Sequence, residues 1–352
     1  MNCCVECFKD SHIKNTINNY EVIGNCDFCA SKNIPVFGLE EIPNPISDMI
    51  MGVVQIYVTS DSTHAKPLKE ALRDEWDIFN AGAELIQALT RQFCMPVLPE
   101  NADIFFRNVA IPQLEDMDFL REFGVVRGQS WHDFSESIKH GNRFHNNIFN
   151  PDAFASFLSV VVKTHPVGSS KFRARISQDK NGFAISDDMK APPISKRSAG
   201  RINPEGVAVL YLSSNCETAL KEVRATAFDY VTIGEFKSLR DLKVVNLSDI
   251  SRTSPFLYSI ELEKYAANRK VFQEIAHELA KPLRRSDSPL EYLPTQYISE
   301  FIKSQGYDGV EYASTLNPGG SNLAIFDETA LECVNLTTVE VEEISYKTVP
   351  EI

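Results

Sequence analysis

The stretch SAGRINPEGVAVLYLSSNCETALKE, residues 198–222, joins a turn, a strand and a helix in one short run. Glycine and proline make residues 200–206 a constrained loop, because glycine adopts backbone angles that other residues avoid. The apolar, β-branched run 207–212 predicts a buried strand. Ser214 and Glu217 have the spacing of a capping box, which predicts a helix that starts directly after that strand.

Three chemically different side chains come from these adjacent elements. The loop presents Arg201, the strand carries Tyr211, and the second turn of the helix carries Glu222. A guanidinium can grip phosphate or a ribose hydroxyl, an aromatic ring can stack on a flat ligand, and a carboxylate can stabilise positive charge. Taken singly, each has a commoner structural explanation: an exposed loop Arg, a core strand Tyr and a solvated helix Glu.

The order of these motifs resembles that of the RES domain family, which is named for its Arg, Glu and Ser. The resemblance covers about residues 170–336, and its motifs are long and ordered, so a chance match is improbable. The segments that carry it are FRAR (172–175), APP (191–193), SAGRINPEG (198–206), LYLS (210–213), ALKE (219–222) and NPGGSNLAIF (317–326).

This resemblance implies a fold related to ADP-ribosyltransferases and an enzyme that breaks down NAD, and many members are toxins of toxin–antitoxin pairs. It implies catalytic roles for Glu222, Arg201, Tyr211 and Ser321. It implies NAD contacts by Arg173, Arg201, Tyr211 and Ser321. Arg173 shares its strand face with Arg175, and the family pattern favours Arg173 for the ligand.

Cleavage of the nicotinamide–ribose bond of NAD builds positive charge on the ribose. A carboxylate such as Glu222 would stabilise that charge, as in glycoside cleavage. Water, phosphate or a macromolecule can accept the ADP-ribose, so an ADP-ribosyltransferase acting on a macromolecule is an alternative. The sequence has no G-x-G-x-x-G fingerprint, so Rossmann-type hydride transfer is unsupported.

Hydrophobic periodicity predicts an α+β protein with three parts. We expect a zinc ribbon at 1–42, a helical domain at 43–168 and a mixed-sheet RES domain at 169–352. The predicted strands are 172–176, 207–212, 230–236, 242–246, 309–312 and 323–326, with 339–347 as an edge strand or a tail. The predicted helices are one starting near 45 and others within 68–79, 84–93, 134–138, 152–162, 215–226, 267–281 and 294–304.

Five of the eight cysteines lie in the first 30 residues. Cys4 and Cys7 form one C-x-x-C pair, and Cys26 and Cys29 form another, which is the spacing of a structural zinc site with four thiolate ligands. A unit this small has little core, so the metal would supply much of its folding free energy. Disulfides and isolated thiols are the alternatives, and Cys3 is a spare that could replace Cys4.

The helical region resembles, more loosely, the HEPN-type region found ahead of RES domains, including the segment KHGNRF at 139–144. HEPN ribonucleases use an Arg-x4–6-His pair, and Arg127 and His132 have that spacing. The motif is weak, so a ribonuclease or nucleic-acid-binding protein is the less favoured alternative. The structural explanation is a solvated loop with Trp131 packed inward.

The net charge of −13 over 352 residues disfavours nonspecific binding to DNA or RNA, which depends on Lys and Arg. No apolar run is long enough to cross a bilayer, and the first residues do not read as a secretion signal. We therefore expect a cytoplasmic protein with NAD as its substrate. An antitoxin protein and a second copy of the chain are candidate partners, and inhibition of the enzyme by the front half of the chain itself is the alternative to a separate antitoxin.

Overall fold

The computed structural model describes residues 1–80, 82–94, 99–193, 198–250, 253–256, 261–281 and 288–345. The chain divides into two compact units, and each is described by itself. Unit 1 comprises Met1–Gly128 and Arg252–Lys270, and unit 2 comprises Gln129–Ser251 and Val271–Ile352. These boundaries differ from the predicted boundaries near residues 42 and 168, which remain predictions.

Unit 1 begins with a small ribbon in which the described residues form a three-stranded antiparallel sheet of order β1-β3-β2. Its elements are β1 (Asn2–Cys4), η1 (Val5–Cys7), α1 (Ser11–Asn19), β2 (Ile23–Gly24) and β3 (Ile34–Gly38). The Asp10 side chain caps α1 by accepting the N–H of Ile13. This ribbon brings the two C-x-x-C pairs of the sequence together.

The rest of unit 1 is mostly helical, as predicted. Its elements are α2 (Pro45–Gln55), β4 (Val58–Thr59), β5 (Lys66–Pro67), α3 (Leu68–Glu75), α4 (Ala83–Cys94), η2 (Pro99–Phe105), β6 (Asn108–Ala110), η3 (Pro112–Leu114) and α5 (Met117–Phe123). Asn44 caps α2 and Pro45 fills its first turn, which confirms the predicted helix start. The short strands, ordered β4-β6-β5, were not predicted, because strands of two or three residues carry no periodicity.

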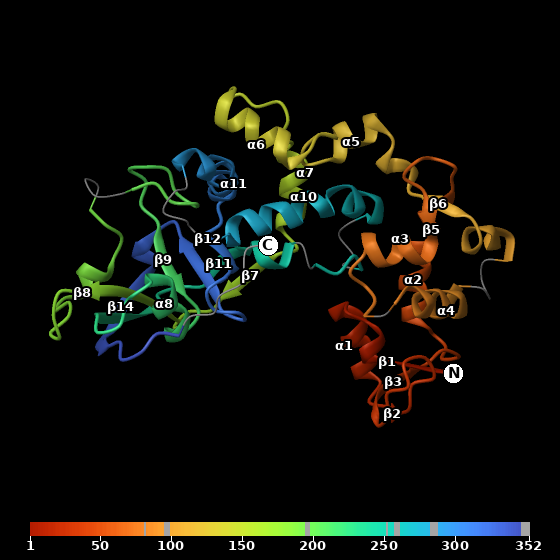
Figure 1. Cartoon of the computed structure of the whole chain (residues 1–352), viewed down its shortest axis with the longest axis horizontal. Coiled ribbons are helices and arrows are strands. Elements are labelled where there is room, and N and C mark those ends of the chain that lie inside the picture. Colours follow the sequence, from red (N-terminus) through yellow and green to blue (C-terminus); the bar gives the residue numbers. More distant parts are fainter. Residues whose placement is uncertain are drawn as a thin grey trace. The chain divides into compact units, whose positions relative to one another are not determined.

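Unit 2 is built on one mixed sheet, in which the described residues form eight strands of order β14-β10-β8-β9-β13-β12-β11-β7 (Figure 1). Neighbouring strands run antiparallel except the β11–β12 pair, which is parallel. The strands are β7 (Val162–His165), β8 (Ser170–Ser177), β9 (Leu210–Ser213), β10 (Tyr230–Ser238), β11 (Leu242–Asn246), β12 (Gly309–Ala313), β13 (Ser321–Ile325) and β14 (Leu331–Glu340).

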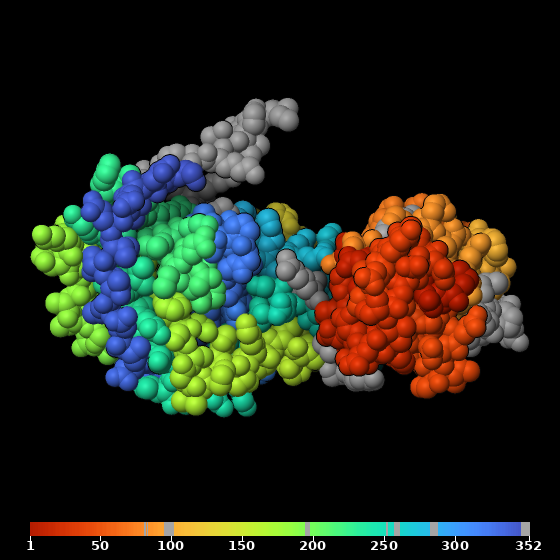
Figure 2. All heavy atoms as spheres, turned by 90° about the horizontal axis from the view of Figure 1, so that it is seen from below, coloured from red at the N-terminus to blue at the C-terminus, as the bar shows by residue number. Residues whose placement is uncertain are grey.

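The predicted strands from 172 to 326 are all present, and β14 is the correction. It starts at Leu331 and ends at Glu340, so only the first two residues of the predicted strand 339–347 belong to it. Residues 346–347 lie outside the described residues. β14 forms an edge of the sheet and lies at the molecular surface, where it appears in deep blue (Figure 2).

Short helices accompany this sheet. They are α6 (Trp131–His140), α7 (Pro151–Leu158), η4 (Ser186–Met189), α8 (Cys216–Val223), α9 (Leu247–Ile250), η6 (Pro289–Tyr292), α11 (Leu293–Ser304) and η7 (Glu328–Ala330). The longer α10 (Leu262–Ala280) contributes its first residues to unit 1 and the others to unit 2. Among the described residues, no helix combines the length and the apolar character that a membrane span requires.

Side-chain alternation divides the sheet into two chemically different faces. One face carries Leu210, Leu212, Leu323 and Ile325, which belong to one buried apolar cluster. The intervening residues of β9 and β13 point the other way, and they include Tyr211 and Asn322. This second face is the one that lines the cavity described below.

The turn, strand and helix of residues 198–222 are present, but the predicted capping box is wrong. Asn215, not Ser214, is the N-cap of α8, and its side chain accepts the N–H of Thr218 at 2.8 Å. Ser214 instead accepts the N–H of Ser321 through its hydroxyl at 3.1 Å. Glu217 is therefore free to pair with Lys221 one turn later, at 2.7 Å.

Candidate active site

A cavity of about 340 Å³ lies in unit 2 between the second face of the sheet, α8 and the loop before β9. A second cavity of about 260 Å³ adjoins it and shares four lining residues with it, namely Arg201, Glu222, Tyr312 and Asn322. The first cavity is also lined by Phe172, Arg173, Gly200, Tyr211, Ser213, Ala219 and Val223. The structure thus brings four of the five predicted site residues in this domain to one cavity.

The loop 200–203 is held in place by the polar side of α11. Gln296 donates its amide N–H groups to the carbonyls of Gly200, at 2.7 Å, and Asn203, at 3.0 Å. Thr295 donates to the carbonyl of Arg201 at 2.8 Å. A Cβ on Gly200 would lie 2.8 Å from the Tyr211 hydroxyl, so a larger residue here would displace the loop or the Tyr211 side chain.

Arg201 reaches the cavity with part of its hydrogen-bonding capacity unused. One terminal nitrogen, Nη1, donates to the backbone carbonyl of Glu278, and the guanidinium carbon lies 5.6 Å from the centre of the Tyr292 ring. Its Nε is buried and has no hydrogen-bond partner among the described residues. A buried donor without a partner is costly, so this nitrogen fits an acceptor atom of a ligand.

Arg173 lines the same cavity from β8 and, like Arg201, has a buried nitrogen that is free to bind a ligand. Its Nη1 is buried, and no residue in the described ranges accepts a hydrogen bond from it. Burial first, and then the neighbouring charge of Arg175, lower the pKa of Arg173 to about 10, so the side chain is still a cation at pH 7. Arg175 instead donates to the carbonyl of Asp188 and lies over the Phe183 ring.

Tyr211 presents its ring rather than its hydroxyl. The hydroxyl donates to Asn203 Oδ1 at 2.7 Å and accepts the N–H of Ile202 at 3.4 Å. Burial raises the pKa of Tyr211 above its usual value, so it stays a neutral phenol at physiological pH. The ring is therefore the part that can contact a flat ligand.

Glu222 lies in the last turn of α8 and borders both cavities. Its Oε1 accepts two hydrogen bonds, from the Ser314 hydroxyl at 2.6 Å and from Asn322 Nδ2 at 2.7 Å. Within the described ranges both bonds end on Oε1, which leaves Oε2 for a ligand. The carboxylate is thus held in one orientation between the two cavities.

Ser321 is the predicted site residue that the structure places elsewhere. Its hydroxyl donates to Glu311 Oε1 at 2.7 Å. Ser321 is not among the described residues that line either cavity. Ser321 and Asn322 are consecutive residues of β13, so their side chains point to opposite faces of the sheet. Asn322 is the one that faces Glu222.

The partner of Ser321 is a buried carboxylate, Glu311, which is 3% exposed. Glu311 also binds His165 Nε2 at 3.0 Å and Lys163 Nζ at 3.2 Å. Burial alone would raise the pKa of Glu311, but the hydrogen bonds from His165 and Ser321 and the charge of Lys163 together lower it to about 2. This cluster holds β7, β12 and β13 together on the core face of the sheet.

The sequence did not single out Ser213, Tyr312 and Asn322, which line the first cavity, or Ser314, which donates to Glu222. Cross-strand register brings three of them together, because Asn322 pairs with Ser213 on β9 and with Tyr312 on β12. Ser213 lies two residues after Tyr211, so strand alternation could have placed it on the same face. The other three depend on pairings between distant segments.

The four predicted metal ligands Cys4, Cys7, Cys26 and Cys29 form one cluster, with all sulfur atoms within 4.8 Å of one another. The Cys4–Cys29, Cys7–Cys26 and Cys4–Cys7 sulfur distances are 3.3, 3.5 and 3.9 Å. A tetrahedral zinc ion with Zn–S bonds of about 2.3 Å separates its sulfurs by roughly 3.8 Å. The cluster therefore fits such an ion, and all eight cysteines, each in the described part of the chain, are free thiols.

Cys3 does not belong to this cluster, although the sequence allowed it to replace Cys4. Cys3 and Cys4 are neighbours on β1, so their side chains point to opposite sides of the strand. The pKa of Cys3 is raised to about 12, chiefly by burial, so it is an unreactive thiol.

The structure shows no feature around Arg127 or His132, the alternative ribonuclease pair, that favours catalysis by the described residues. Arg127 donates to the backbone carbonyl of Arg121 at 3.1 Å. His132 is exposed in the first turn of α6, whereas Trp131 is buried against Phe134, as predicted.

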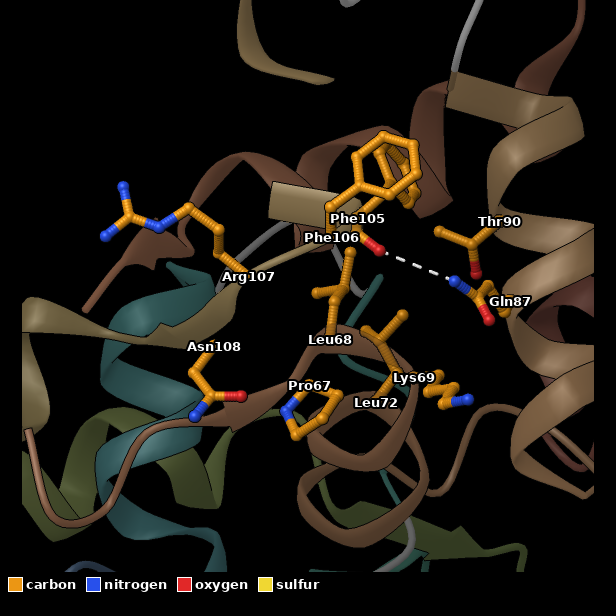
Figure 3. Close-up of a pocket in the computed structure, with 10 residues that line it drawn as sticks. All are labelled: Pro67, Leu68, Lys69, Leu72, Gln87, Thr90, Phe105, Phe106, Arg107 and Asn108. Carbon is orange, nitrogen blue, oxygen red and sulfur yellow. Dashed lines mark hydrogen bonds between the residues drawn. The ribbon is translucent and has the colours of Figure 1, made fainter. Parts of the chain in front are cut away.

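Unit 1 has a cavity of its own, of about 300 Å³, between α3, α4 and the segment 105–108 (Figure 3). Its cations are already paired, Lys69 with Glu84 and Arg107 with Asp61. Gln87 donates to the Phe105 carbonyl at 3.4 Å, along the dashed line in the figure. None of the described residues that line this cavity is a carboxylate, in contrast to the cavity in unit 2, which Glu222 lines.

The comparison with protein-family models agrees with the sequence motifs. The model of the RES domain matches residues 173–347. A search of curated proteins found no match. One solved structure that matches is described as the crystal structure of the M. tuberculosis MbcT-MbcA toxin–antitoxin complex; it is 14% identical, covers 53% of this chain and 92% of that chain, and has a TM-score of 0.31. On the strength of the family match, residues 173–347 of this chain are a RES domain.

Proposed function

We propose that this protein is an NAD-consuming enzyme that cleaves the nicotinamide–ribose bond. The observation that carries the proposal is the composition of one cavity: two buried arginine donors that have no partner among the residues the structure describes, an aromatic ring and an oriented carboxylate. NAD offers a matching set of groups, namely a diphosphate, two riboses and a flat cationic ring. RES family membership supports NAD breakdown as the chemistry.

The residues would divide the work as follows. Arg173 and Arg201 would bind the diphosphate or ribose oxygens with the donors that are unpaired in the described part of the chain. Tyr211 would pack its ring against the nicotinamide. Glu222 would hold a ribose hydroxyl through Oε2 and stabilise the positive charge that develops on the ribose as nicotinamide leaves.

The assignment of Ser321 as an NAD-contacting residue rests only on its position in the RES family motif. Its hydroxyl is bonded to Glu311 and faces away from Asn322. To reach a ligand it would have to exchange that bond, so Ser321 remains a prediction.

We further propose that the cysteine cluster is a structural zinc site and that the protein acts as an NAD-depleting toxin. The donor set is all thiolate, the cluster is largely buried, and four ligands leave no open position for substrate. The toxin role, and with it an antitoxin partner in the cytoplasm, rests on family membership.

The test is product analysis after incubation of the full chain with NAD. Hydrolysis converts NAD and water to nicotinamide, ADP-ribose and a proton, whereas phosphorolysis gives nicotinamide and ADP-ribose phosphate. Running the reaction with and without inorganic phosphate separates the two. If NAD is consumed only when a macromolecule is added, the protein is an ADP-ribosyltransferase, and intact NAD under all conditions contradicts the proposal.

A further inference from the structure

We propose that Asn322 is a positioning residue for Glu222: it fixes the orientation of the carboxylate that faces the ribose. This inference rests on the proposed function of the cavity. Asn322 Nδ2 lies 2.7 Å from Glu222 Oε1, and Asn322 lines both cavities. With 7% of its surface exposed, it holds this bond with little competition from water.

The amide of Asn322 is itself oriented by the strand beside it. The Ser213 hydroxyl donates to Asn322 Oδ1 at 2.9 Å, and the two residues are direct partners in the β9–β13 register. Because Oδ1 accepts from Ser213, the opposite end of the amide, Nδ2, is the end turned toward Glu222. Ser213, Asn322 and Glu222 thus form a chain of hydrogen bonds that runs from the sheet to the cavity and ends on the Glu222 carboxylate as the acceptor.

Ser314 completes the arrangement from the loop after β12. Its hydroxyl donates to the same Oε1 at 2.6 Å and accepts the N–H of Asn317 at 3.1 Å. Two donors that converge on Oε1 leave Oε2 as the oxygen presented to a ligand. A carboxylate held in this way needs no reorientation when positive charge appears on the substrate.

Asn322→Ala is the direct test, with nicotinamide release as the assay. We expect kcat to fall about 10- to 100-fold, the size of one lost hydrogen bond to a charged group. KM should stay within about threefold of the wild-type value, because Glu222 acts mainly in the transition state. Ser213→Ala, which only frees the amide to rotate, should lower kcat by about 2- to 10-fold.

The matched control is Asn246→Ala. Asn246 is also 7% exposed, lies at the end of β11 and donates Nδ2 to the Asp249 carboxylate at 2.5 Å, but it lines neither cavity. Its substitution removes a similar buried bond in the same unit, so kcat should remain within about twofold of wild type. Equal losses of kcat in both variants would show a general structural effect and overturn the inference.

The double mutant Asn322→Ala/Glu222→Gln shows whether Asn322 acts through Glu222 or has a role of its own in catalysis. If Asn322 acts through the charge of Glu222, Asn322→Ala should change kcat less than about threefold when Glu222 is already Gln. A full additional loss in that background, or an effect of Asn322→Ala on KM alone, would contradict the inference. Should Asn322→Ala fail to fold, Ser213→Ala carries the test, and an unchanged kcat in it overturns the inference.

A readout without NAD keeps this inference distinct from the proposed function. In protein labelled with ¹⁵N at asparagine, the side-chain signal of Asn322 is the one lost in Asn322→Ala. Glu222→Ala and Ser213→Ala should each shift that signal, whereas Asn246→Ala should not. A wild-type protein that leaves NAD intact but shows these shifts refutes the function and keeps the hydrogen-bond chain, and absent shifts refute the chain.

Discussion

Arg201→Ala should weaken NAD binding as well as turnover, because Arg201 would contact groups that are already present in the ground state. The lost contact is a charge-assisted hydrogen bond from a buried Nε that has no protein partner in the described part of the chain. Such a bond contributes about 1.5–3 kcal/mol, which corresponds to a rise in Kd of roughly 10- to 150-fold. Arg201→Lys should rescue binding poorly, because an ammonium cannot bind the Glu278 carbonyl and a ligand through the same planar fork.

Isothermal titration of NAD measures this effect. The Arg201 variants should be made in the Glu222→Gln protein, because that protein should cleave NAD too slowly to consume it during the titration. Arg240→Ala is the matched control, since Arg240 lies outside both cavities and pairs with Asp308 at 2.6 Å. It should bind NAD with unchanged affinity. An Arg201→Ala protein that is folded and binds NAD as tightly as its background would refute the assignment of Arg201 to the substrate.

Elemental analysis of protein purified without chelator should find one zinc ion per chain. The Cys26→Ser variant should lose the metal, and its N-terminal ribbon should unfold while the RES domain stays folded. Absence of metal in the wild type would contradict the zinc site. Glu311 has a folded-state pKa of about 2, below its ordinary 4.5, so the stability that it contributes is fully present above pH 4.5 and is lost as the pH falls toward 2. Urea unfolding across that range should show this loss, at most about 3 kcal/mol, and the loss should be smaller in Glu311→Gln. His132→Ala should leave NAD turnover unchanged, and a loss of toxicity with normal NAD levels would favour ribonuclease chemistry instead.

Local patterns in the sequence predicted the elements of the site well. Glycine, proline and the apolar run placed a loop, a strand and a helix between 198 and 222, where the structure has them. The helix start was one residue off, because Asn215 has a side chain as suitable for capping as that of Ser214. The two C-x-x-C pairs likewise predicted a cluster, since each pair needs only a tight turn to bring its sulfurs together.

The partners of Glu222 could not be predicted in the same way. Ser314 and Asn322 lie about a hundred residues after it in the sequence, and they reach it only because β9, β13 and β12 pair in one register. A shift of one residue in β13 would exchange Ser321 for Asn322 at the cavity. Motif order identifies the segment NPGGSNLAIF but does not say which of two consecutive side chains faces the ligand.

The most direct test of the account is a comparison of nicotinamide release and NAD binding in the wild type and in Glu222→Gln. The substitution keeps the shape of the side chain and the two donors on Oε1, but it removes the charge that would stabilise the forming ribose cation. We predict that turnover falls by about 10²-fold or more, the usual size of one preorganised electrostatic group, while Kd for NAD changes little. Wild-type turnover in Glu222→Gln would contradict the claim that this carboxylate drives NAD cleavage.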